Sequence, residues 1–113
     1  MAKRRGESAT ITRGSTNVFK DLGYPDAAER QAKLRLAYAL NQVLEHRGLT
    51  QAAAGSLLGL SQPKVSALRN YKLAGFSVER LMTFLNALGQ DVEIVIKNKP
   101  RSRQSARITV VAA

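Results

Sequence analysis

The strongest constraint on the fold is a run of twenty residues, 51–70, that carries glycines at two particular positions. Gly55 lies inside a short apolar segment, and Gly59 follows directly after it. Two short helices that meet at a steep angle need a small residue where their axes approach. The tight connection between them needs a residue that tolerates positive φ, as glycine does. The run therefore predicts a helix over residues 51–58, a tight turn at Gly59 and a second helix over about residues 62–70.

Apolar side chains inside both predicted helices and the turn supply a shared core. They are Ala54, Leu58, Leu60, Val65 and Leu68. Thr50 and Ser61 precede the two helices and are predicted to cap them. A generic helical hairpin needs neither a turn glycine nor a small residue four positions earlier, so we favour a helix-turn-helix. Such a unit places its second helix in the major groove of DNA.

Helical periodicity on both sides of this unit predicts a mainly α-helical bundle. An apolar stripe at helical spacing predicts a long helix from Asp26 to about His46, which Gly48 ends. Ser77 is predicted to cap another helix over residues 78–88. Aromatic residues make up only 5% of the chain, which also favours a helical core over a β-sandwich.

A short strand is predicted after the last helix, because apolar side chains recur at every second position over residues 91–96. A lone strand leaves an unpaired edge, which has to be covered. Pairing with the same strand of a second copy would form a homodimer, and we favour this arrangement. Its predicted interface residues are Val92, Ile94, Val95 and Ile96. The alternative is a hairpin within one chain, in which residues 108–111 form the second strand.

Composition divides the chain into three parts. Residues 1–16 are predicted to be a flexible basic arm, residues 17–97 the folded domain, and residues 98–113 a basic tail. Residues 17–26 contain three large apolar side chains and are expected to pack on the domain as a lead-in. The folded core is therefore expected to lie between two basic ends.

The net charge of +10 is concentrated in a few segments. Residues 48–72 carry three basic and no acidic residues, and residues 97–113 carry five basic residues alone. This distribution predicts binding to a polyanion, of which nucleic acid is the natural one. The alternatives are tails that only improve solubility, or a ribosome-associated protein.

Several classes of protein find no support in the sequence. The chain has no cysteine, and its single histidine, His46, is placed at a predicted helix end, so no metal site is expected. There is no carboxylate pair, nucleophile–base set or glycine-rich phosphate loop, so we expect neither an enzyme nor a cofactor. No apolar stretch approaches the roughly 20 residues that cross a bilayer, and the start of the chain is not typical of a secretory signal. We expect a cytoplasmic protein without membrane contact.

The polar face of the second helix provides the predicted DNA contacts. Gln62 is the best candidate to read a base, because its amide pairs bidentately with adenine. Lys64 is predicted to reach guanine acceptors or a phosphate, and Ser66 to hydrogen-bond either. Gln51 begins the first helix, whose N-terminus favours a phosphate. The complete predicted set is Gln51, Ser61, Gln62, Lys64, Ser66, Arg69, Asn70 and Lys72. The last three are expected to grip the DNA backbone.

With these residues in place, the sequence resembles the XRE/Cro–C1 helix-turn-helix regulators, and most closely their HigA-type antitoxin subgroup. The resemblance covers about residues 17–97. The motifs that carry it are NVFKDLGYPD at 17–26, RGLTQ at 47–51, LGLSQPKVS at 58–66, GFS at 75–77, RL at 80–81 and GQDVEI at 89–94.

The resemblance implies a lambda-repressor-like bundle of about five helices, with the strand at its C-terminal end, that binds an inverted repeat in DNA as a dimer. It also implies a RelE/ParE-like ribonuclease toxin as a partner, which the antitoxin neutralises while it represses their shared operon. The alternative is a free-standing XRE-type repressor that has no toxin.

The resemblance also implies roles for particular residues. Gln51 matches the family's phosphate-contacting glutamine, and Gln62, Lys64 and Ser66 fall on its base-reading face. The chain departs from the family in its basic turn at residues 70–72, which is expected to raise non-specific affinity. Residues that contact a toxin vary between subgroups and are not transferred.

Overall fold

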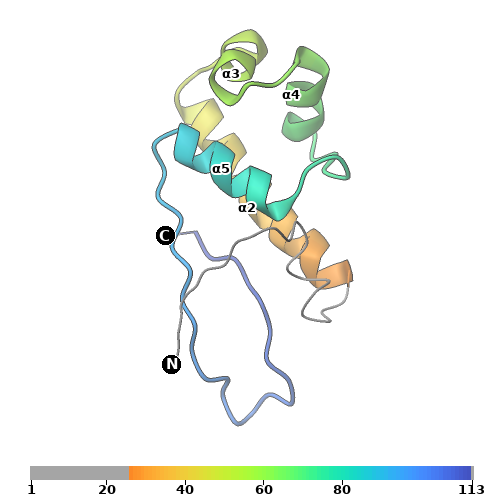
Figure 1. Ribbon diagram of the computed structural model, residues 1–113, viewed down its shortest axis with the longest axis vertical. Coiled ribbons are helices and arrows are strands. Elements are labelled where there is room, and N and C mark those ends of the chain that lie inside the picture. Colours follow the sequence, from red (N-terminus) through yellow and green to blue (C-terminus); the bar gives the residue numbers. More distant parts are fainter. Residues whose placement is uncertain (1–25, 113) are drawn as a thin grey trace.

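The computed structural model describes residues 26–112, which contain four helices followed by a long irregular segment (Figure 1). The helices are α2 (Asp26–His46), α3 (Gln51–Leu58), α4 (Gln62–Arg69) and α5 (Val78–Ala87). The long α2 packs against α5 and α4, and α3 packs against α4 and α5. The predicted helix bounds agree with these to within one residue, so the mainly helical helix-turn-helix fold is confirmed.

Side-chain caps begin α3 and α5 where the sequence predicts them. Thr50 Oγ1 accepts a hydrogen bond of 3.1 Å from the backbone N–H of Ala53, and Ser77 Oγ accepts one of 3.1 Å from that of Arg80. Each bond satisfies an amide group that a helix N-terminus otherwise leaves unpaired. Gly59 ends α3 in the left-handed region, with φ of 68°. Local sequence signals therefore set the limits of these helices.

Gly55 is the position where α3 comes into close backbone contact with the turn that follows it. A Cβ atom here would lie 2.7 Å from the carbonyl oxygen of Leu60 and 3.4 Å from Cγ2 of Val65. The first distance is shorter than nonbonded carbon and oxygen atoms tolerate, so the backbone itself requires glycine. The small residue predicted from the sequence is thus explained by the crossing of α3 and the turn.

An aliphatic core joins the four helices of the described chain. Its largest fully buried side chains are Leu40, Leu44, Val65, Leu68, Leu81 and Leu88. Phe76 and Phe84 pack edge to face beside them, with their ring centroids 6.1 Å apart. Because α4 contributes both Val65 and Leu68, its inward face is fixed on α2 and α3.

The predicted C-terminal strand does not form in the single chain, and the described residues hold four of the expected total of about five helices. Within residues 26–112 there are four helices and no strand. The backbone of residues 91–96 makes no hydrogen bond to another described residue. A strand forms only when its backbone pairs with a neighbour. Residues 108–111 do not pair with this segment, so the hairpin within one chain is not formed either.

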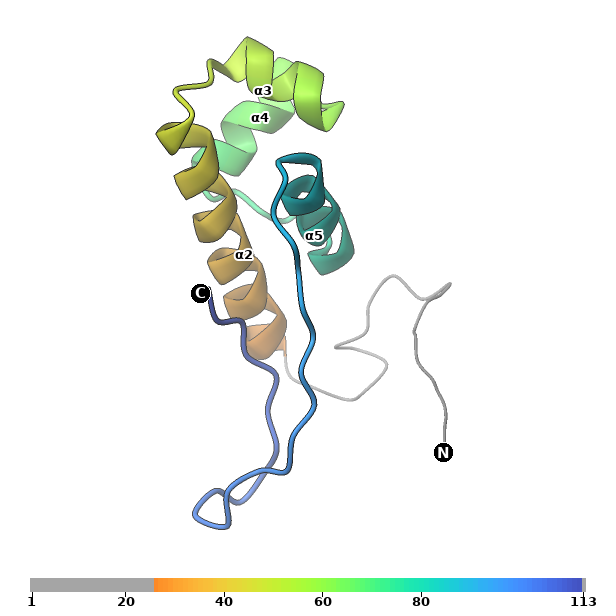
Figure 2. The same cartoon turned by 90° about the vertical axis from the view of Figure 1, so that its left-hand side faces the viewer.

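The segment that follows α5 runs away from the helices and then turns back toward α2 (Figure 2). The returning part is held there by Arg35, whose guanidinium donates a hydrogen bond of 3.1 Å to the carbonyl oxygen of Val110. Val92 and Val110 are partly buried against the core. The C-terminal segment is therefore attached to the helices at both of its ends.

Two further expectations concern a membrane-spanning helix and the N-terminal part of the chain. No helix among residues 26–112 is long and apolar enough to cross a membrane. The basic arm predicted over residues 1–16 lies outside the described residues, as does nearly all of the lead-in predicted over residues 17–26.

Candidate nucleic-acid interface

Two of the predicted DNA contacts, Gln51 and Gln62, lie on one surface at the starts of α3 and α4. Both begin their helices, and both line a shallow depression of about 470 Å³ that Ser56 and Gly59 also border. Neither helix has an acidic residue in its first turn. Because helix N-termini expose backbone N–H groups and the positive end of the helix dipole, this surface is suited to a phosphate oxygen.

The second helix of the pair, α4, buries an apolar side and exposes a polar one. Val65 and Leu68 are fully buried, whereas Gln62 and Lys64 are exposed and Ser66 is half-buried. This is the division that the sequence predicts. The exposed side of α4 is therefore available to contact a ligand as large as a DNA duplex.

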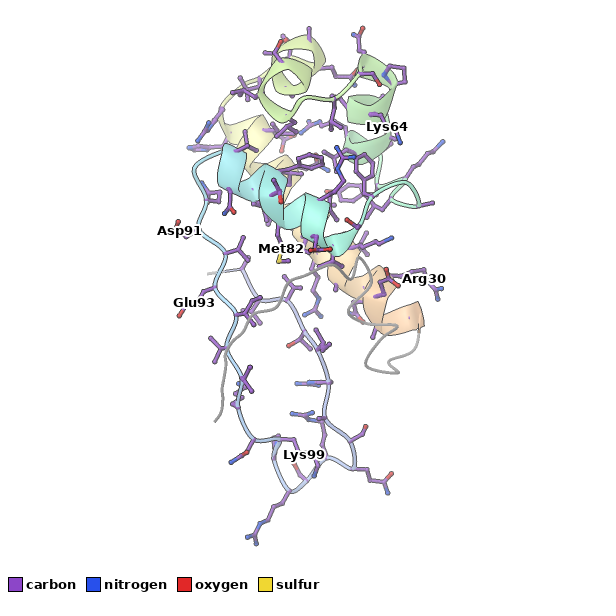
Figure 3. All side chains as sticks on the ribbon, viewed as in Figure 1. Arg30, Lys64, Met82, Asp91, Glu93 and Lys99 are labelled. Carbon is purple, nitrogen blue, oxygen red and sulfur yellow. The ribbon has the colours of Figure 1, made fainter. Side chains whose placement is uncertain are left out.

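The Lys64 side chain lies over an aromatic ring (Figure 3). Its Nζ atom is 5.6 Å from the centroid of the Phe76 ring. A Cβ atom at Gly75 would lie 3.1 Å from the same Nζ atom, so the glycine leaves room for the ammonium group. A cation–π contact at an exposed site contributes only about 0.5–1 kcal/mol. Lys64 can therefore leave the ring for a guanine or a phosphate at small cost.

Two of the residues predicted to contact the DNA backbone, Arg69 and Asn70, have hydrogen-bond partners within the protein. Arg69 Nη1 donates a hydrogen bond of 3.2 Å to the backbone carbonyl oxygen of Asn41 in α2. Asn70 Nδ2 donates one of 2.8 Å to the carbonyl oxygen of Ser66, which ties down the end of α4. In this structure the half-buried Arg69 fixes α4 on α2, whereas Asn70 caps the end of α4 and stays exposed.

Asn41 is a residue that the sequence analysis missed. Its side chain is buried between α2 and α4, and its Nδ2 donates a hydrogen bond of 3.1 Å to the carbonyl oxygen of Leu68. With the bond from Arg69 to Asn41, this makes a reciprocal pair of hydrogen bonds between the two helices. The available signal was a polar residue inside the apolar stripe of α2, since buried amides almost always have partners.

The remaining predicted contacts, Ser61 and Lys72, are exposed. Ser61 has the extended backbone of a helix cap, but its hydroxyl makes no cap hydrogen bond. Pro63 follows in the first turn of α4 and removes one of the amide groups that the cap would satisfy. Lys72 makes no side-chain hydrogen bond or ion pair to another residue between 26 and 112. Both side chains are therefore available at the surface beside α4.

Comparison with known proteins identifies the family. A family model described as a helix-turn-helix domain matches residues 18–97. A solved structure of a protein provisionally named an XRE family transcriptional regulator is 75% identical in sequence, with a TM-score of 0.75. The match covers 79% of this chain and 100% of that chain. A comparison with curated proteins found no match. The extent of the family match and the identity to this relative mean that the chain belongs to the helix-turn-helix domain family and to the XRE regulators within it.

Proposed function

We propose that the chain is a sequence-specific DNA-binding repressor that inserts α4 into the major groove. The observation that carries this proposal is the surface that Gln51 and Gln62 share at the starts of α3 and α4. It lies in a segment, residues 48–72, with three basic and no acidic residues. A phosphate bound at the start of α3 would fix the protein on the duplex and turn the exposed side of α4 toward the base edges. The name of the 75% identical relative, a transcriptional regulator, supports the regulatory role.

The proposed contacts fall into two groups. Gln62 reads a base, with Lys64 and Ser66 beside it on the same helix. Gln51 and Lys72 contact phosphates, which position the protein without reading sequence. Ser61 is exposed next to Gln62 and is assigned to the same surface. Arg69 orients α4 through its hydrogen bond to Asn41, and Asn70 caps the end of α4.

We also propose that the repressor acts as a homodimer on an inverted repeat. One helix-turn-helix reads only a few base pairs, and two of them on one face of a duplex need half-sites about one helical turn apart. Ile94, Val95 and Ile96 are between 71% and 93% exposed in the single chain, which leaves three adjacent apolar side chains in water. Pairing of residues 91–96 between two copies would cover these side chains and form the strand that one chain lacks.

Within this function we propose an antitoxin role, in which the protein represses its own operon and neutralises a RelE/ParE-like toxin. Support comes from the motifs at residues 17–26, 47–51 and 89–94, which resemble the HigA-type subgroup. Co-expression with the adjacent reading frame tests the role. An antitoxin relieves the growth arrest caused by that protein and co-purifies with it. If it does neither, the alternative of a free-standing regulator is correct.

The experiment that tests DNA reading is selection from a random duplex pool at about 150 mM salt, near physiological ionic strength. The unmodified chain is expected to enrich an inverted repeat. In the matched variant Gln62→Ala, one position in each half-site should relax, and affinity for the enriched site should fall by about 1–3 kcal/mol. Recovery of unenriched DNA would overturn the proposal of sequence-specific repression.

A further inference from the structure

The C-terminal segment contains a second basic surface, which we call the basic loop and define as residues 97–107. It carries five lysine and arginine residues, and no acidic residue occurs anywhere after Glu93. The family match ends at residue 97, where the loop begins. The helix-turn-helix family therefore gives no account of this charge.

The basic loop has internal hydrogen bonds. The backbone N–H of Arg103 donates to the carbonyl oxygen of Pro100 at 3.2 Å, and Lys99 Nζ donates to the carbonyl oxygen of Arg103 at 2.9 Å. Arg103 Nη1 donates to the carbonyl oxygen of Ser105 at 3.2 Å. These bonds occupy two of the five cations. They also give the loop a defined turn at its tip.

The other three cations, Lys97, Arg101 and Arg107, are exposed. None of them has a hydrogen bond or ion pair to another residue in the described range 26–112. The end of the loop is held on the protein, because Val110 packs on the core and accepts the hydrogen bond from Arg35. Like charges without counter-ions repel one another, so an anion that neutralises all three would bind favourably.

The basic loop and α4 lie at opposite ends of the molecule. Figures 1 and 2 place α3 and α4 at one end of the long axis and the loop at the other. Figure 3 shows the same for Lys64 and Lys99, with Asp91 and Glu93 between the two basic surfaces. The longest extent of the chain is 45 Å. A straight duplex that lies across the α4 end, perpendicular to the long axis, is therefore out of reach of the loop of the same copy.

We propose that the basic loop binds the phosphate backbone of a second DNA segment, independently of sequence, so that the protein joins two duplexes. The inference rests on the proposed function for the first duplex, which α3 and α4 hold. Phosphate is favoured over an acidic protein surface because the loop offers spaced cations without an aromatic or large apolar side chain between residues 97 and 107. A protein interface of useful affinity normally has such anchors, whereas backbone phosphate contacts need only charge.

A capture experiment with the full chain tests the proposal. A duplex that carries the enriched inverted repeat is fixed to beads, a second fluorescent duplex of random sequence is added in solution, and anisotropy separately measures the affinity for the single inverted-repeat duplex. The loop variant K97Q/R101Q/R107Q removes the three unpaired charges. The matched control K97R/R101K/R107K keeps them, and neither variant alters a side chain that the helices use.

The unmodified chain and the control should capture the second duplex, whereas the loop variant should lose capture about tenfold or more and keep single-duplex affinity within about twofold. The dependence of log capture on log salt should become shallower by about 0.9 for each phosphate that the loop variant no longer neutralises, or about three units in all. Equal capture by the loop variant would overturn the proposal, because two helix-turn-helix units of an oligomer would then suffice. If the loop variant lost single-duplex affinity as strongly as it lost capture, the loop would belong to the first DNA interface, and the proposal would also be overturned.

Failure of the proposed function gives a different result. If the unmodified chain binds single duplexes but captures no second one, bridging is wrong and the proposed function stands. If the unmodified chain binds no duplex at all, both proposals are wrong.

Discussion

At the scale of single residues, the arrangement of α4 depends on two side chains whose contacts between helices the sequence analysis did not predict. Asn41 donates to the carbonyl oxygen of Leu68, and Arg69 donates to the carbonyl oxygen of Asn41. A buried hydrogen bond contributes little net free energy, but leaving a buried partner unpaired costs about 1–3 kcal/mol. The two bonds therefore make α4 lie on α2 in one particular orientation.

This assignment separates Arg69 from Lys72, two cations that the sequence analysis treated alike. Arg69→Ala should lower the free energy of unfolding by about 0.5–1.5 kcal/mol, because its bond to Asn41 is removed. Lys72→Ala should change it by less than about 0.5 kcal/mol but lower the salt slope of random-duplex binding by about 0.9. Urea unfolding and affinity at several salt concentrations measure both quantities. A lower salt slope for Arg69→Ala as well would mean that its guanidinium meets a phosphate.

Gly55 provides a second test at this scale. Gly55→Ala should destabilise the fold by about 1–3 kcal/mol, because the new Cβ atom would press on the carbonyl oxygen of Leu60. Gly75→Ala is the matched control, since its Cβ atom would meet only the end of the flexible Lys64 side chain. Thermal unfolding followed by circular dichroism compares the two. Equal midpoints would show that the turn relaxes around the added carbon.

At the scale of secondary-structure elements, local signals predicted where the helices begin and end, although the cap hydrogen bond predicted for Ser61 is not formed. The limits of α3 follow from Thr50 and Gly59, and the start of α5 follows from Ser77, all within a few residues of the helix they limit. The contact of Lys64 with Phe76 and the contact of Arg69 with Asn41 join residues distant in sequence, and no local pattern predicts them. The predicted strand over residues 91–96 also depends on a partner that is distant in sequence. The alternation of apolar side chains shows that this segment can pair, but it does not identify the partner.

The helix caps give a paired test of local bonding. Ser77→Ala should lower the free energy of unfolding by about 1 kcal/mol, because the amide of Arg80 loses its acceptor. Ser61→Ala should cost less than about 0.5 kcal/mol, because the Ser61 hydroxyl makes no cap hydrogen bond. Denaturant titration of both variants measures the difference. A cost for Ser61→Ala as large as that for Ser77→Ala would show that Ser61 caps α4 in solution.

At the scale of the whole molecule, the exposed apolar segment after α5 predicts the state of association. The unmodified chain should sediment as a dimer at micromolar concentration, and I94E/I96E should sediment as a monomer. Both side chains are mostly exposed in the single chain, at 74% and 93%, so helix content should not change. I94K/I96K is the control for the sign of the added charge and should also be monomeric. A monomeric unmodified chain would contradict the proposed pairing of residues 91–96.

The exposure of the basic loop has a consequence for cleavage of the protein by proteases. Exposed loops with few buried contacts are preferred sites of proteolytic nicking, and Lys97 and Arg101 offer cleavage points to enzymes that cut after basic residues. A cut after Arg101 leaves all four described helices intact and removes the covalent link to the part of the loop that carries Arg107. If the loop bridges duplexes, one such cut would leave Lys97 and Arg101 on the domain and hold Arg107 only through the contacts of Val110 with Arg35 and the core. Processing would then weaken the hold on the second DNA segment while repression at the bound site continues.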